Sequence, residues 1–285
     1  MSNSILVDGK KIAARLQNDL KNNLLELNFS EPIKLAVILV GDDPASQIYA
    51  NKKKIIAKDL GIICDVYELS KDSTAKEVID KINFLQQDKN LYGLIVQLPL
   101  PDNLWSQTRL ITDHIRPELD VDCLSHFSLG KILMNELYFV PPIIGAVREI
   151  LNEYKIELEG KHVCLVGRGE LIGRPLAAYF LNLPVTLSVC GKSTKKLSDI
   201  TKQADILISG VGKPNLINAD MVKSGAVVID LATTYNQGKV QGDIDFNSVK
   251  TKASLLTPVP GGIGPITVIK LMENIVFAVR NKKST

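Results

Sequence analysis

The residues from 162 to 175, HVCLVGRGELIGRP, decide the fold class of this chain. Val163 to Val166 is an apolar run with the length of one β-strand. Gly167 to Gly173 follows at once, and Pro175 falls in the first turn of an expected helix. A strand, a glycine-rich loop and a helix in this order are typical of a dinucleotide-binding site. The spacing, G-x-G-x-x-x-G, is one residue longer than the usual fingerprint, so the neighbouring segments have to support this prediction.

The segments after this loop continue the pattern. Val185 to Cys190, Ala204 to Ser209 and Gly225 to Asp230 are apolar runs typical of buried strands. A helix fits before each of the last two. Strands that alternate with helices predict a parallel sheet covered on both faces, the Rossmann-type arrangement.

The end of the second of these strands indicates which dinucleotide is bound. In NAD sites this strand normally ends at an acid that binds the ribose hydroxyls. Here Cys190 is followed by GKSTKK, residues 191 to 196, which contain no carboxylate. Together with Arg168 in the glycine loop, this favours a ribose that carries a 2′-phosphate, and therefore NADP over NAD. The alternative is an ordinary basic surface turn.

The first half of the chain shows the same alternation. Asp8 can cap a helix in which Ile12, Leu16, Leu20 and Leu24 recur every four residues. Strands are expected at 34–40, 62–69 and 93–98, and a helix at 75–87. Ligands of such sheets bind at the carboxyl ends of the strands, where Gln97 falls.

The segment Ser46 to Lys53 is the first candidate for chemistry. Asp43 and Pro44 predict a helix start, which places Tyr49 and Lys53 one turn apart on one helix face. A phenol and an ammonium side by side suit acid/base catalysis. The alternative is a solvated run of three lysines, residues 52 to 54.

Two loops are further candidates. Asp120-Val121-Asp122 lies in an irregular stretch, where the carboxylates could be ordinary loop acids. Thr257 to Thr267 combines three prolines with three glycines, which would fix the backbone and let a ligand contact bare main chain. A final helix is expected from Thr267 to Val279.

The composition excludes several classes of protein. A net charge of +3 over 285 residues does not indicate binding to nucleic acid, and no apolar window is long enough for a membrane span or a signal sequence. We therefore expect a cytoplasmic protein with no membrane or nucleic-acid partner. The four cysteines form no C-x-x-C pair and the three histidines show no ligand spacing, so reduced thiols and no metal are expected.

These segments together resemble the bifunctional methylenetetrahydrofolate dehydrogenase/cyclohydrolases over nearly the whole chain. Six blocks, in the order and spacing of that family, carry the resemblance: Asp43 to Tyr49 with Lys53, Val96 to Pro101, Asp120 to Asp122, Gly167 to Pro175, Val211 to Pro214, and Thr257 to Thr267. A Tyr-x-x-x-Lys pair also occurs in short-chain dehydrogenases. In those enzymes the glycine loop precedes the pair, whereas here it follows, and we reject that family.

The resemblance implies an α/β fold with two domains, a cleft between them, and a homodimer. Residues 1–140 would form the folate-binding catalytic domain, with a helix at 266–281 packing back on it, and residues 141–265 the Rossmann-type NADP-binding domain. The implied reaction oxidises 5,10-methylenetetrahydrofolate to the methenyl cation with NADP. Hydrolysis then gives 10-formyltetrahydrofolate.

The resemblance also implies site residues. Lys53 would be the essential acid/base of the hydrolysis, with Tyr49 positioning the folate and Asp122 holding the pterin ring. Gln97 would hydrogen-bond Lys53, and a neutral partner orients an amine without stabilising its charge. The implied catalytic residues are Lys53, Tyr49, Gln97 and Asp122; the substrate-binding residues are Tyr49, Lys53, Val96, Gln97, Leu98, Asp122, Pro260, Gly261, Gly262, Ile263 and Gly264; and the cofactor-binding residues are Gly167, Arg168, Gly169, Lys192, Ser193 and Thr233.

Several positions depart from the family pattern, all on the cofactor side or at the junction. Pro142 to Ile144 replaces Cys-Thr-Pro, Gly169 replaces the usual Ser, Gly191-Lys192 replaces His-Ser, and Leu231 to Thr234 replaces Val-Gly-Ile-Asn. Two alternatives therefore stay open. One is a homologue with cyclohydrolase activity and weak or altered dehydrogenase activity, and the other is a non-catalytic folate-binding protein.

Overall fold

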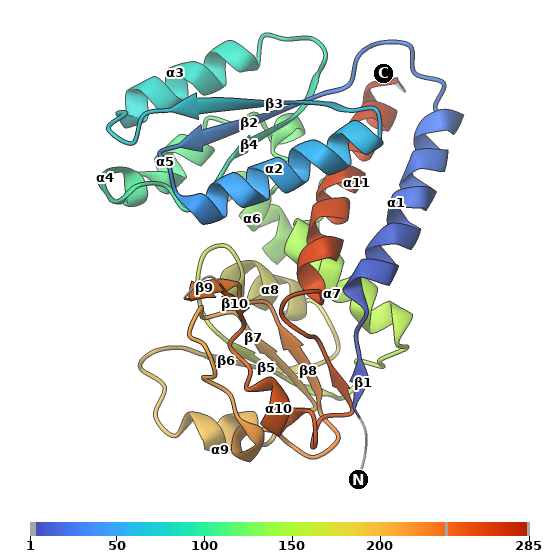
Figure 1. The fold of residues 1–285 in the computed structure, drawn as a ribbon, viewed down its shortest axis with the longest axis vertical. Coiled ribbons are helices and arrows are strands. Elements are labelled where there is room, and N and C mark those ends of the chain that lie inside the picture. The colour runs from blue at the N-terminus through green and yellow to red at the C-terminus, as the bar shows by residue number, and fades with distance from the viewer. Residues whose placement is uncertain (1–3, 237–238, 284–285) are drawn as a thin grey trace. The chain divides into compact units, whose positions relative to one another are not determined.

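The computed structural model describes residues 4–236 and 239–283 (Figure 1). The chain divides into two compact units. Unit 1 contains the N-terminal residues through Ala13, Ile132–Asn135 and Ile143–Thr267, and unit 2 contains Ala14–Lys131, Glu136–Pro142 and the residues from Val268 onward. Helices α1 (Gly9–Glu26) and α11 (Ile263–Lys283) each begin in unit 1 and continue in unit 2.

Within the described ranges, unit 1 contains a six-stranded parallel sheet. Its strands, in spatial order, are β1 (Ile5–Leu6), β11 (Leu255–Leu256), β8 (Val227–Asp230), β7 (Ile206–Ser209), β5 (His162–Val166) and β6 (Thr186–Cys190). From β5 the chain goes first to β6 on one side and then returns to β7 on the other. This reversal is the topological switch point at which parallel sheets bind ligands.

Helices cover the sheet of unit 1. Helix α8 (Gly173–Phe180) packs on β5 and β6. Apolar side chains of α9 (Leu197–Thr201), the 3₁₀ turn η2 (Ala219–Met221) and α10 (Phe246–Val249) pack on an apolar cluster that contains Val166, Leu207 and Val228. Helix α7 (Pro142–Glu153) starts at a proline, and a short antiparallel hairpin pairs β9 (Thr234–Asn236) with β10 (Lys239–Gln241).

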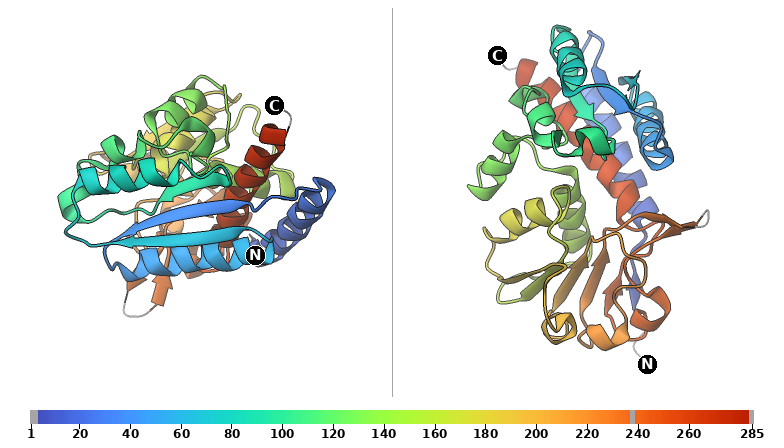
Figure 2. Two further views of the ribbon diagram at one scale, coloured as in Figure 1. Left: turned by 90° about the horizontal axis from the view of Figure 1, so that it is seen from above. Right: turned by 90° about the vertical axis from the view of Figure 1, so that its left-hand side faces the viewer.

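Unit 2 contains a three-stranded parallel sheet in the order β3 (Ile63–Leu69), β2 (Lys34–Val40) and β4 (Leu91–Val96). Helices α2 (Pro44–Asp59) and α3 (Ala75–Leu85) lie on opposite faces of this sheet (Figure 2, left). The face under α3 also buries apolar side chains of α4 (Asp102–Trp105), α5 (Thr108–Thr112) and the 3₁₀ turn η1 (Pro117–Leu119). Helix α6 (His126–Leu133) follows the loop after η1.

The two-domain α/β fold class is confirmed, and the strands and long helices lie within a few residues of their predicted positions. The prediction of a helix before β8 is wrong. That segment forms only the single 3₁₀ turn η2, because Pro214, Asn215 and Gly225 leave little room for a helix. The two-residue strands β1 and β11 were not predicted. Since β1 pairs with β11, Ile5 and Leu6 belong to unit 1, while the domain boundaries at residues 140 and 265 stay a prediction.

No helix among the described residues is both long and apolar enough to cross a membrane. The four cysteines are buried and free, as expected. Burial raises the pKa of Cys64 to about 11.

Candidate active site

Helix α2 carries Lys53 on its buried face. Asp43 caps the helix, accepting hydrogen bonds from the Ser46 amide and hydroxyl, both at 2.8 Å. The buried residues Ser46, Ala50, Lys53 and Ala57 follow the helical repeat, so they form one stripe against the sheet. Lys53 is 8% exposed, whereas its neighbours in the lysine run, residues 52 and 54, are exposed.

The ammonium of Lys53 contacts two side chains of unit 2. Its Nζ donates to Gln97 Oε1 at 3.1 Å and lies 3.7 Å from Asp122 Oδ2. Gln97 directly follows the buried end of β4, and its backbone N–H donates to Ile38 O of β2 at 2.8 Å. Its Nε2 donates to Leu98 O at 2.9 Å, which turns the Oε1 atom toward Lys53. Three of the residues expected to be catalytic are therefore brought together.

The carboxylate of Asp122 changes the expected electrostatics. A neutral partner alone was expected to orient the amine, but Asp122 also forms an ion pair with it. Burial raises the pKa of Asp122, Lys53 lowers it, and the nearby charge of Asp120 raises it again. The Asp122 side chain keeps 26% of its surface exposed, so the pair remains open to a ligand on one side.

Tyr49 lies one turn before Lys53 and is partly buried. Its ring centroid is 5.3 Å from the Nζ of Lys52, a cation–π contact at the exposed edge of the helix. Val96 is the last, buried residue of β4 and pairs with Ile38, and Leu98 packs on the apolar cluster below α3.

The glycine loop of unit 1 has little room for side chains. Gly167 has a φ of +123°, and a Cβ there would lie 2.7 Å from Gly210 O, at the end of β7. A Cβ on Gly173, at the start of α8, would lie 2.2 Å from Gly167 O. Gly169 is different, because a Cβ there would meet open space. The loop thus presents bare main chain at the switch point between β5 and β7.

Arg168 connects this loop with the turn after β6. Its Nη2 donates to Ser193 Oγ at 3.3 Å. Its guanidinium occupies the space that a side chain on Gly191 would need, because a Cβ there would lie 2.3 Å from Arg168 Nε. Lys192 is exposed beside it. Glu170 of the loop forms an ion pair with Arg174 at 2.9 Å. The turn therefore has cationic groups where NAD sites carry an acid.

Two buried carboxylates hold the loops after β7 and β8, and sequence reasoning missed both. Asp243 accepts hydrogen bonds from Ser209 Oγ at 2.7 Å, Val211 N at 2.6 Å and Lys213 N at 2.7 Å. Asp230 accepts from Ala232 N at 3.0 Å and Ile244 N at 2.9 Å. Burial raises the pKa of Asp230 to about 6 against the lowering effect of these bonds. For Asp230 the signal in the sequence was an acid at the end of an apolar run, and Asp243 had no such signal.

The remaining expected residues lie in unit 1. Thr233 is exposed on the segment after β8, and Thr234 Oγ1 lies 3.8 Å from the position of a Cβ on Gly212. Part of the segment Pro260 to Gly264 packs against Gly9 at the start of α1. Gly9 N donates to Gly261 O at 3.0 Å, and a Cβ on Gly9 would lie 1.6 Å from Gly262 O. Gly261 and Gly264 face open space, so bare main chain remains available there.

This arrangement fits a dinucleotide. Glycines at Gly167 and Gly173 remove the side chains that would block the end of β5, and α8 begins directly after the loop. Arg168 and Lys192 supply positive charge at the turn after the neighbouring strand.

Comparison with known proteins gives a consistent result. Residues 7–122 match the catalytic-domain model of tetrahydrofolate dehydrogenase/cyclohydrolase, and residues 141–283 match its NAD(P)-binding-domain model. The bifunctional protein FolD of Nitratiruptor sp. is 41% identical over 98% of this chain and 99% of its own length.

Solved structures agree with the sequence matches. The bifunctional enzyme FolD from Campylobacter jejuni is 39% identical with a TM-score of 0.91, over 98% of this chain and 99% of that one. The dehydrogenase-cyclohydrolase of Trypanosoma brucei, solved in complex with NADP cofactor and inhibitor, is 30% identical with a TM-score of 0.94 over all of both chains. The chain belongs to the tetrahydrofolate dehydrogenase/cyclohydrolase family.

Proposed function

We propose that this protein is a bifunctional enzyme of one-carbon folate metabolism. It oxidises 5,10-methylenetetrahydrofolate to the 5,10-methenyl compound and hydrolyses that compound to 10-formyltetrahydrofolate. The observation that carries the proposal is the buried Lys53 with Gln97 at 3.1 Å and Asp122 at 3.7 Å. Both domain models match, which supports a chain that retains both activities.

Lys53 serves the hydrolytic step. Water adds to the cationic methenyl carbon, and one carbon–nitrogen bond then breaks to open the ring. The added water must lose a proton and the leaving nitrogen must gain one, so a single amine beside the carbon can act in both steps. Gln97 holds the amine by its oxygen, and Asp122 supplies negative charge beside a cationic substrate. Tyr49, on the same helix, positions the folate.

Apolar side chains and exposed main chain supply further substrate contacts. Val96 and Leu98 flank Gln97: Leu98 contributes apolar surface to the folate site, and the fully buried Val96 supports Gln97 from the end of β4. In the segment Pro260 to Gly264, the exposed main chain of Gly261 and Gly264 is suited to contact a planar ligand closely.

The cofactor is NADP. When bound, its nicotinamide ring accepts the hydride that leaves the one-carbon bridge. Gly167 to Gly169 approach its phosphates with bare main chain, and Thr233 lies on the segment after β8 that flanks the site. The 2′-phosphate is bound by Arg168, Lys192 and Ser193, since Gly191 leaves the space that the Arg168 guanidinium occupies. The homodimer implied by the family resemblance stays a prediction.

Steady-state kinetics of the purified protein test the proposal. We expect reduction of NADP with methylenetetrahydrofolate, slower reduction of NAD, and hydrolysis of methenyltetrahydrofolate. Hydrolysis without reduction of either dinucleotide would support the homologue with a weakened dehydrogenase. Folate binding without either reaction would contradict the enzyme and leave a binding protein.

A further inference from the structure

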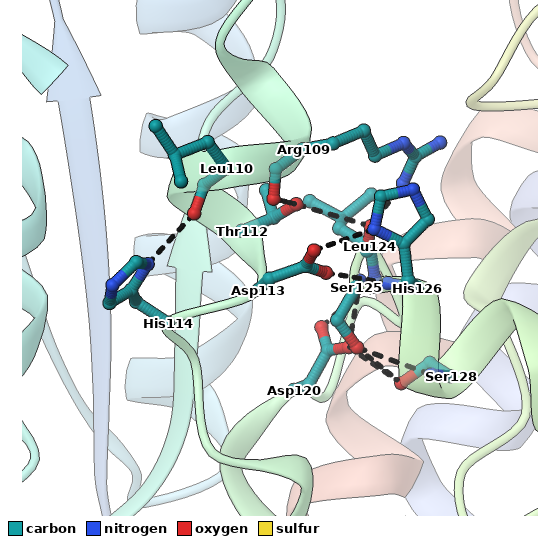
Figure 3. A network of polar contacts seen from close by, with 10 residues as sticks. All are labelled: Arg109, Leu110, Thr112, Asp113, His114, Asp120, Leu124, Ser125, His126 and Ser128. Carbon is teal, nitrogen blue, oxygen red and sulfur yellow. Dashed lines mark hydrogen bonds and ion pairs between the residues drawn. The ribbon is translucent and has the colours of Figure 1, made fainter.

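The loop that carries Asp122 also contains a buried aspartate, Asp120, which takes no direct part in the proposed reaction. Asp120 is 0% exposed and lies two residues before Asp122. Figure 3 shows its carboxylate directed toward Ser125 and Ser128. Its Oδ1 accepts from Leu124 N at 2.9 Å, and its Oδ2 accepts from Ser125 N at 3.0 Å and from the hydroxyls of Ser125 and Ser128, both at 2.6 Å.

These four hydrogen bonds tie the loop to the start of α6. A buried carboxylate needs such donors, because unpaired negative charge in a protein interior is strongly unfavourable. Leu124 is held from the other side as well, since its carbonyl oxygen accepts from Arg109 Nη1 and from Thr112 Oγ1 (Figure 3). The segment after Asp122 therefore has few ways to move.

The segment before Asp122 is fixed by other elements of unit 2. Asn274 of α11 donates to Val121 O at 2.8 Å. Val121 packs over Gly93 of β4, where a Cβ would lie 2.8 Å from its side chain. Cys123, on the other side of Asp122, has a φ of +56°, a conformation that a residue with a side chain keeps only when its surroundings hold it.

We propose that Asp120 is a positioning residue for the hydrolytic site: its buried carboxylate holds the loop 121–128 so that the Asp122 carboxylate stays beside the Lys53 ammonium. This inference rests on the proposed hydrolysis and deepens it. Asp120 touches neither Lys53 nor substrate and acts through Asp122.

The charge of Asp120 gives a signature that a purely structural role lacks. Among the described residues, Lys53 of α2 and Asp120 are the charged groups that shift the pKa of Asp122. The Cys123 thiol next to it is neutral, since burial raises its pKa, and Gln97 and Asn274, which bind Lys53 and Val121, are neutral too. Asp120 raises the pKa of Asp122, so Asp120→Asn removes that effect and the pKa falls. Loosening of the loop hydrates Asp122, which lowers its pKa, and separates it from Lys53, which raises its pKa; because burial is the largest of these causes, the net pKa should fall.

The test compares three variants in hydrolysis of methenyltetrahydrofolate over a range of pH. Asp120→Asn should lower the rate by roughly 100-fold, the cost of displacing a group at a reacting centre. Ser128→Ala removes one of the four donors and should lower the rate by about three- to tenfold, with no shift of the pH profile. Asp80→Asn is the matched control: it makes the same change at an exposed acid of α3 that pairs with Lys76, and it should stay within about twofold of the wild type.

Wild-type activity is lost as the pH falls through the pKa of Asp122, and in Asp120→Asn this acid limb should move to lower pH. Carbon-13 NMR of the Asp122 carboxyl, with its signal assigned from an Asp122→Asn sample, measures the same shift without activity. A folded Asp120→Asn protein with the wild-type rate and pKa would overturn the proposal. If Asp120→Asn does not fold, Ser128→Ala is the deciding variant, and a rate of hydrolysis equal to that of Asp80→Asn overturns the proposal. A wild-type protein without hydrolysis would overturn the proposed function instead, whatever the NMR titration shows.

Discussion

The lysine site of unit 2 and the glycine loop of unit 1 both lie at the carboxyl ends of parallel strands, but they are built from different parts. Lys53, Gln97 and Asp122 are charged or polar side chains whose positions depend on hydrogen bonds to other side chains. Gly167 and Gly173 contribute main chain, and their positions depend on the absence of a Cβ. In both units a fully buried aspartate, Asp120 or Asp243, binds the amides of the loop nearby.

This difference has a consequence for mutation. A site made of side chains fails when one functional group is removed, while a site made of main chain fails when an atom is added. If the hydrolytic and hydride-transfer steps depend on separate units, substitutions of the two kinds should separate the two activities.

The largest effect should come from removing the amine. Lys53→Met keeps the length of the side chain but has no group to transfer a proton, so hydrolysis of methenyltetrahydrofolate should fall about 10³-fold or more. Lys54→Met is the matched control, because its exposed side chain lies outside the buried stripe of α2. NADP affinity should be unchanged in both variants. Hydrolysis by Lys53→Met at the rate of Lys54→Met would exclude the proposed mechanism.

The next largest effect should come from adding a methyl group to the loop. In Gly173→Ala the new Cβ would lie 2.2 Å from Gly167 O, and the main chain must shift to relieve the contact. We expect NADP binding to weaken by about 2 kcal/mol, or roughly 30-fold, measured by titration calorimetry.

Hydrolysis in Gly173→Ala should persist, provided that the assay contains no dinucleotide. Gly130→Ala makes the same chemical change in α6, where a Cβ meets open space, and should affect neither activity. Equal NADP affinity in Gly173→Ala and Gly130→Ala would show that the loop does not approach the cofactor.

The smallest effect should come from the exposed turn. Lys192→Ala removes a charge that water screens, so NADP binding should weaken by about fivefold while NAD binding hardly changes. Lys195→Ala, in the same basic run, should change the ratio of NADP affinity to NAD affinity less than Lys192→Ala does. Equal losses for NADP and NAD in Lys192→Ala would rule out a contact with the 2′-phosphate.

The strands and the fold class were predictable because central parallel strands must be apolar on both faces. Residues 34–40, for example, are buried except for the first, which is half-buried. The burial of Lys53 could not be read from three consecutive lysines, because it depends on which helix face meets the sheet. The family blocks resolved that ambiguity.

The parts that could not be predicted depend on contacts between distant residues. Asp120 and Asp243 resemble ordinary loop acids until the fold brings their amide and hydroxyl donors around them. Strand β1 is two residues long and has no periodicity of its own, so its partner alone defines it. The placement of Ile5 and Leu6 in unit 1 follows from this pairing and could not be predicted for the same reason.

The pairing of Ile5–Leu6 with Leu255–Leu256 also constrains the order of events at the ribosome. The sheet of unit 2 uses strands that all lie between residues 34 and 96, so it can assemble while most of the chain is still to be made. Strand β1, by contrast, has to wait until residue 255 is synthesised. Ile5 and Leu6 thus find their place at the edge of the sheet only after the other strands of unit 1 have been made.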